Sequence, residues 1–133
     1  MANEAVCIVA PTEFTRYTVA DAAGIAKGTL LKLSADPNTA AASSAAGDVF
    51  AGIAWEEKTA NDGVTNIGVA LNGTWDLTCG GAGATLGAVL VLSGANLVGN
   101  SVEADLVLGR VVGKAMETGS AAEVIRVRVW SVV

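Results

Sequence analysis

The sequence of 133 residues contains no histidine. Histidine is the commonest general base near neutral pH and the commonest metal ligand in proteins. Its absence excludes a Ser-His-Asp triad and a Cys-His pair. We therefore expect neither enzymatic activity nor a cofactor nor a bound metal ion.

Cysteine is also scarce, because the chain has only Cys7 and Cys79. These two residues form neither a CxxC motif nor any spacing typical of metal ligands. Two free thiols in a reducing compartment are the favoured interpretation, and a disulfide between them stays open. The N-terminus lacks the basic region of a signal peptide, and no apolar run reaches the ~20 residues of a membrane span. We expect a soluble protein whose links to a membrane are at most indirect.

Positive charge is sparse as well. Eight Lys and Arg face thirteen Asp and Glu, which gives a net charge of −5 and a pI of about 4.5. The basic residues are scattered along the sequence, whereas nucleic-acid-binding proteins carry a basic patch or stripe. Direct binding of nucleic acid or of an anionic membrane surface is therefore not expected.

Aromatic residues make up only 5 % of the chain, although 52 % of it is hydrophobic and the mean hydropathy is +0.52. Much of that hydrophobic fraction is alanine, so the core should consist of Val, Leu and Ile. Eighteen valines and sixteen glycines favour strands and tight turns over long helices. The composition predicts a mainly β protein of one domain by length.

The N-terminal residues 1–26 leave two interpretations open. Residues 5–10 and 12–19 have strand-like character, and Pro11 separates them. The segment is either an arm that packs on something else or the first strand of the body. We divide the chain into an N-terminal arm, residues 1–26, and a β-rich body, residues 27–133. Residues 18–26 are expected to form one helical turn or a loop around Gly24.

The body contains a series of short strands separated by turn signals. Strands are expected at residues 27–33, 49–55, 64–71, 74–78, 86–92, 105–112 and 123–130, whereas residues 97–102 are a short apolar segment around Gly99 and Asn100. The Ala/Ser-rich residues 39–46 are expected to form a short helix or a surface loop. In the last strand Ile125, Val127 and Val129 should face inward, and Arg126 and Arg128 outward.

The hairpin at residues 48–71 has a weaker copy at residues 109–129. An alignment without gaps places Ile53 on Val111, Ile67 on Ile125, and Val69 on Val127. Both segments consist of a strand, a polar link and a second strand with alternating aliphatic residues. The number and spacing of such strands predict a small β-barrel or β-sandwich with at most one short helix.

The sequence contains only weak matches to catalytic or ligand-binding motifs. Glu56 and Glu57 are adjacent, and adjacent strand residues point to opposite faces, so they are unsuited to act as a catalytic carboxylate pair. The glycine-rich residues 79–84 lack the Lys-Ser/Thr ending of a phosphate-binding loop, and strand-forming residues follow them. A solvated strand end and a surface loop are the favoured interpretations of these two motifs.

The sequence offers better candidates for residues that contact other proteins than for catalytic residues. Trp and Arg are enriched where proteins meet, and Trp130 alternates with Arg128 and Arg126 on one expected outer face. We therefore assign an oligomer interface to Trp55, Arg126, Arg128 and Trp130. The alternative for each tryptophan, Trp75 included, is a place in the core or at its rim.

The layout resembles the capsid decoration (cement) proteins of tailed phages, a group that includes the lambda-type head decoration protein. The resemblance covers most of residues 27–130 and rests on aliphatic and glycine patterns: KGTLLKL at 27–33, FAGIA at 50–54, IGVAL at 67–71, NGTWDL at 72–77, LGAVLVL at 86–92, LGRVV at 108–112 and VIRVRV at 124–129. The chain departs from the family in its Ala/Ser linker and in residues 95–105.

The resemblance implies a structural protein without catalysis that binds the outer surface of a phage head as a homotrimer. It would be made in the host cytoplasm and would stabilise contacts between major capsid protein subunits. The arm would contact the capsid, and its candidate contact residues are Val6, Ile8, Phe14, Arg16 and Tyr17. Two alternatives stay open: a phage tail or baseplate β-module, and a small-ligand or carbohydrate-binding barrel with Trp55 or Trp75 in its cleft.

Overall fold

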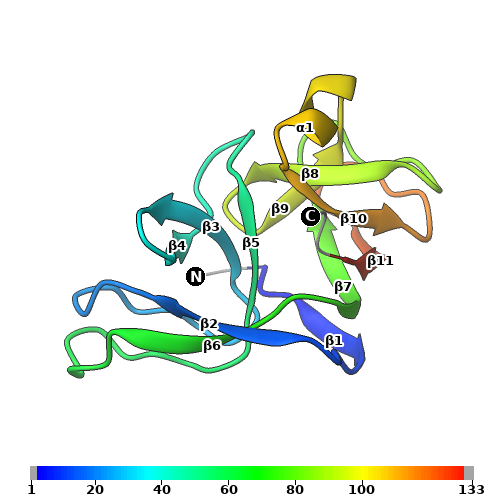
Figure 1. Ribbon diagram of the computed structural model, residues 1–133. Coiled ribbons are helices and arrows are strands. Elements are labelled where there is room, and N and C mark those ends of the chain that lie inside the picture. The colour runs from blue at the N-terminus through cyan, green and yellow to red at the C-terminus, as the bar shows by residue number, and fades with distance from the viewer. Residues whose placement is uncertain (1–2, 131–133) are drawn as a thin grey trace.

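The computed structural model describes residues 3–130 and shows two closed five-stranded β-barrels packed together (Figure 1). Strands dominate, and the described residues contain one short helix, α1 (Glu103–Val107). The expected fold class, a mainly β protein built as a small barrel or sandwich with at most one short helix, is confirmed, and the architecture is a pair of barrels. The described residues contain no helix that is long and apolar enough to cross a membrane.

The first barrel occupies the N-terminal half of the chain. Its strands follow the closed order β2-β4-β3-β5-β6. They are β2 (Phe14–Thr18), β3 (Leu30–Ala35), β4 (Thr39–Ala42), β5 (Phe50–Ala54) and β6 (Asn66–Ala70).

The second barrel occupies the C-terminal half. Strand β7 pairs with both β11 and β9, which closes the order β7-β11-β10-β8-β9. The strands are β7 (Gly73–Cys79), β8 (Val89–Gly94), β9 (Leu97–Asn100), β10 (Val111–Ala115) and β11 (Val124–Val129). One further strand, β1 (Val6–Val9), pairs with β7 and ends this sheet.

The two barrels repeat one topology. Strands β2 to β6 pair in the same order and with the same directions as β7 to β11, including a parallel pair between β2 and β4 that matches the one between β7 and β9. The repeat extends to turns, because Asn38 and Asn96 both adopt positive φ, 45° and 57°, just before the third strand of each barrel, β4 and β9. The chain is therefore a tandem of two copies of one five-stranded unit.

The sequence echo detected part of this repeat. Ile67 and Ile125 are equivalent, as the ungapped alignment has them, since both are buried at the second position of β6 and β11. The alignment of Ile53 with Val111 is wrong. Strand pairing with β3 and β8 makes Phe50 the counterpart of Val111, because Lys32 lies beside Phe50 as Val91 lies beside Val111.

Alternation along β11 positions its side chains as expected. Ile125, Val127 and Val129 are buried, and Arg126 and Arg128 are exposed. The core of the first barrel is aliphatic and includes Leu31 and Ile67. A larger cluster fills the second barrel and extends into the junction between the barrels.

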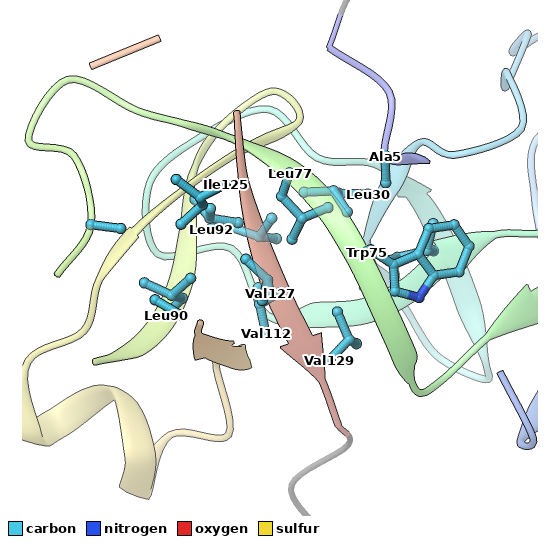
Figure 2. Close-up of a cluster of buried hydrophobic side chains, with 14 of the residues drawn as sticks. Ala5, Leu30, Trp75, Leu77, Leu90, Leu92, Val112, Ile125, Val127 and Val129 are labelled. Carbon is cyan, nitrogen blue, oxygen red and sulfur yellow. The ribbon is translucent and has the colours of Figure 1, made fainter. Parts of the chain in front are cut away.

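The junction is built from side chains that leave the first barrel. Leu30, Ile53 and Ala70 belong to the cluster of the second barrel rather than to that of their own. Figure 2 shows Leu30 beside Leu77 and Trp75. Trp75 is almost fully buried, with 1 % of its surface exposed. Side chains of the first barrel therefore help to bury the apolar core of the second barrel, and are themselves buried there.

Polar contacts hold the junction at two places. On one side the buried Asn96 accepts a hydrogen bond from the Leu30 backbone N–H at 2.8 Å. On the other, Asn72 Oδ1 accepts the N–H groups of Thr12 and Glu13 at 2.8 and 3.1 Å. Asn72 thereby ties together the two segments in which the chain passes between the barrels.

The N-terminal segment resolves one open alternative. Strand β2 pairs along its full length with β6, as the first strand of a barrel rather than as a free arm, and β1 pairs with β7. Of residues 18–26, Thr18 ends β2 and residues 19–26 form a loop rather than a helical turn. Residues 1–2 of the arm lie outside the described residues.

Two element predictions are wrong. The Ala/Ser-rich residues 39–46 form neither a helix nor only a loop, because residues 39–42 are β4, whose small side chains pair with β3. The strand expected at residues 105–112 begins only at Val111, and α1 precedes it. Asp105 accounts for the helix start, since its carboxylate accepts the backbone N–H of Val102 at 2.9 Å.

Both cysteines are free thiols, Cys7 exposed and Cys79 buried. Burial, followed by the nearby Glu123 and Glu117 carboxylates, raises the pKa of the Cys79 thiol. We expect a thiol reagent at neutral pH to label one cysteine in the native protein and two after denaturation, because the thiolate is the reactive form. Mass spectrometry of the labelled peptides measures this. Labelling of native Cys79 at the rate of Cys7 would contradict the prediction, and the variant Cys7→Ser is the control.

Candidate interaction surface

Strand β1 presents an apolar edge to solvent. Val6, Ile8 and Val9 are 59 %, 40 % and 56 % exposed. The strand is the last of its sheet and pairs with β7 along one side only, and in Figure 1 it lies at the lower right. An exposed apolar edge strand offers both unpaired backbone groups and apolar side chains to a partner.

A second apolar feature is a ladder of three aromatic rings. The ring of Phe14 lies 5.3 Å from that of Trp55, and Trp55 lies 6.0 Å from Trp75, both in edge-to-face geometry. Phe14 is 48 % exposed, Trp55 half-buried and Trp75 buried. Lys27 Nζ lies 4.5 Å from the centre of the Trp55 ring. The exposed end of the ladder adds an apolar contact at the surface of the first barrel, and its buried end, Trp75, lies opposite Cys7 of β1.

The remaining residues assigned to capsid contact have two different environments. The exposed Arg16 forms an ion pair with Glu56 at 3.2 Å and contacts Asn66. Tyr17 is half-buried and packs against the core of the first barrel. Arg16 is therefore available at the surface, whereas much of Tyr17 serves the fold.

A cationic face lies on the outside of β10 and β11. Lys114 and Arg128 are directly opposite one another across the strand pair, and both are exposed. Arg126 lies two residues from Arg128 and forms an ion pair with Asp76 at 3.3 Å. Like charges opposite each other disfavour the folded sheet slightly. An acidic partner surface would relieve this repulsion.

The residues assigned to an oligomer interface lie in two places. Trp130 is half-buried and lines a shallow hollow with Arg128, Val9 and the turn after β6. Trp55 lies instead with Phe14 and lines a different hollow. Sequence reasoning missed Val9 and Lys114, because only strand register shows that they lie beside the assigned residues.

The acidic motif Glu56-Glu57 and the nearby loop have structural roles. The Glu56 carboxylate accepts the Gly68 N–H and pairs with Arg16. In the loop, buried Lys58 Nζ donates to Asp62 Oδ1 at 3.1 Å. The Val64 N–H, followed by Lys58, holds the pKa of the Asp62 carboxyl below its usual value. Residues 3–130 bring together no group of His, Cys, Asp and Glu suited to a metal ion.

The described residues thus form a β-module of two filled barrels, and its notable surface features are an apolar edge strand and a cationic face. Among solved structures, the chain is similar to the N base of the head fiber gp8.5 of bacteriophage phi29. The match has a TM-score of 0.55 and 13 % identity, and covers 91 % of this chain and 98 % of the other. No protein-family model matches the sequence, and no curated protein does. The similarity is one of fold.

Proposed function

We propose that the protein is a structural component of a phage head, a decoration protein that binds the outer capsid surface as a homotrimer. In this role it would stabilise contacts between major capsid protein subunits, without catalysis. The observation that carries the proposal is the match of the whole double barrel to a head-fiber base.

The described surface supports this role. Val6, Ile8 and Phe14, which the sequence resemblance assigned to capsid contact, are exposed and lie on two strands that follow each other in the chain, β1 and β2. A decoration protein needs a folded body with an exposed surface that binds the capsid. Repetition of one modest contact over the capsid lattice gives strong overall attachment. Trimer contacts are proposed for the cationic face and Trp130.

The two alternatives receive less support. A ligand-binding barrel with Trp55 or Trp75 in its cleft is disfavoured, because Trp75 is buried in the core and Trp55 lines a hollow on the outside of the first barrel with Phe14. Both barrel interiors are filled by side chains rather than open to a ligand. A tail or baseplate module has no observation in its favour beyond the shared β architecture.

The proposal predicts saturable binding to expanded, empty heads of the phage that encodes the protein. Replacing Val6, Ile8 and Val9 together with serine should weaken this binding at least about tenfold, because each exposed aliphatic side chain can contribute on the order of 1 kcal/mol when buried. Co-sedimentation with the heads, followed by gel quantification, measures the effect.

The matched control is Leu86→Ser with Val102→Ser, which removes exposed apolar side chains that are 65 % and 66 % exposed elsewhere on the second barrel. That variant should bind heads like the parent protein. The proposal fails if the parent protein stays in the supernatant while the heads are intact.

A further inference from the structure

One edge of β7 is shared by two strands. At its C-terminal end Thr78 and Cys79 pair with β9 in parallel. At its N-terminal end the same edge, over residues 74–76, pairs with β1 in antiparallel direction. The N-terminal segment of the chain thus fills the half of the β7 edge that the barrel itself leaves open.

Strand β2 is the counterpart of β7 in the first barrel. Thr18 pairs in parallel with Thr39 of β4, as Thr78 pairs with Leu97 of β9. Opposite β6, Phe14 and Arg16 occupy the positions that Thr74 and Asp76 occupy opposite β11. Residues 14–16 therefore correspond to the part of β7 that binds β1.

The backbone of β2 points the required groups toward this edge. The N–H of Val19 bonds to Thr65 on the β6 side, whereas the N–H of Thr18 bonds to Asn38 on the other side. Because these directions alternate along a strand, the N–H and C=O groups of Phe14 and Arg16 also face away from β6. Within residues 3–130, β4 pairs with β2 only at Thr18, and no other strand pairs with this edge.

We propose that the edge of β2 at residues 14–16 is a strand-binding site that takes an extended apolar segment of another protein. The precedent is internal, because the equivalent edge of β7 binds the apolar sequence Val6–Val9. The surroundings are suitable, because Phe14 and Arg16 are exposed and Trp55 lies beside Phe14. Main-chain hydrogen bonds would supply affinity, and contact with Phe14 would favour apolar side chains.

The occupant comes from another protein rather than from β1 of a second copy. Strand β1 is joined to β2 by a short turn and docks on its own second barrel. Such a tethered strand has a high effective concentration at its own site, which outcompetes exchange between molecules. This inference does not depend on the proposed function.

The test uses a synthetic peptide of residues 3–11, with Cys7→Ser, as a probe for the edge of β2. Titrated into the full-length protein, the free peptide should bind saturably by isothermal calorimetry and change the fluorescence of Trp55. Arg16→Pro should weaken binding at least about tenfold, because proline removes a donor that the barrel does not use. The matched control Arg16→Gln keeps the N–H and should bind within about threefold of the parent.

A second measurement does not depend on folding of a variant. Peptides that are N-methylated at single positions should lose binding at alternate residues only, because an added strand bonds through every second residue. Absent saturation, equal binding of all methylated peptides, or unchanged binding by folded Arg16→Pro would overturn the proposal. Self-association of the parent protein that Arg16→Pro abolishes would overturn the assignment of the occupant to another protein.

Discussion

Replacing Trp75 with alanine is expected to lower the free energy of unfolding by about 3–5 kcal/mol, the usual cost of removing a large buried aromatic side chain. Trp75 is 1 % exposed and lies in the cluster that joins the two barrels. Its indole N–H also donates to the Asn72 carbonyl at 3.0 Å. The loss would therefore leave a cavity at the junction and free an acceptor. Urea denaturation monitored by circular dichroism measures the change.

The control for this prediction is Trp55→Ala. Trp55 is half-buried and packs at the margin of the same cluster, so its removal should cost clearly less than that of Trp75. Equal costs for the two substitutions would show that the junction does not depend on Trp75. A single unfolding transition in both variants would show that the barrels unfold together.

Asn96→Ala is expected to destabilise the protein by about 2–4 kcal/mol. The substitution removes the acceptor of the Leu30 N–H, and a buried donor left without a partner costs about 1–3 kcal/mol. It also places alanine at a φ of 57°, a left-handed conformation that costs about 1 kcal/mol more. Thermal or urea denaturation measures the loss.

The tandem repeat supplies the matched control. Asn38 occupies the equivalent turn of the first barrel with a φ of 45°, but it is exposed at the surface. Asn38→Ala should therefore cost only about 1 kcal/mol, from the backbone conformation alone. If both alanine variants are destabilised equally, the hydrogen bond across the junction contributes nothing measurable.

Strands with alternating bulky and polar residues could be predicted from the sequence. In β11 the aliphatic residues at every second position left one register that buries them all. Strand β4 gave no such signal, because its residues Thr39–Ala42 are small on both faces. These residues form a strand because they pair with β3, and local sequence does not predict which segments pair.

The duplication was only half visible for a related reason. The copies differ by short insertions and deletions in their turns, so an ungapped alignment holds for one strand and fails for the next. The prediction of functional residues from the sequence is limited in the same way, because it also depends on how distant segments pair. The exposure of Val6 and Ile8 was predictable only as a hypothesis, and the cationic pair of Lys114 and Arg128 required strand register.

Asn72 has a mechanical consequence. The backbone passes between the barrels once at residues 10–13 and again at residues 71–72, and Asn72 fastens these two passages to each other. Asn96 fastens the junction elsewhere, at Leu30. Bending one barrel against the other would therefore strain the hydrogen bonds of both Asn72 and Asn96. A pulling force on β1 would shear its hydrogen bonds with β7. Because the two barrels are joined at Asn72 and Asn96, they would resist this force together as one body.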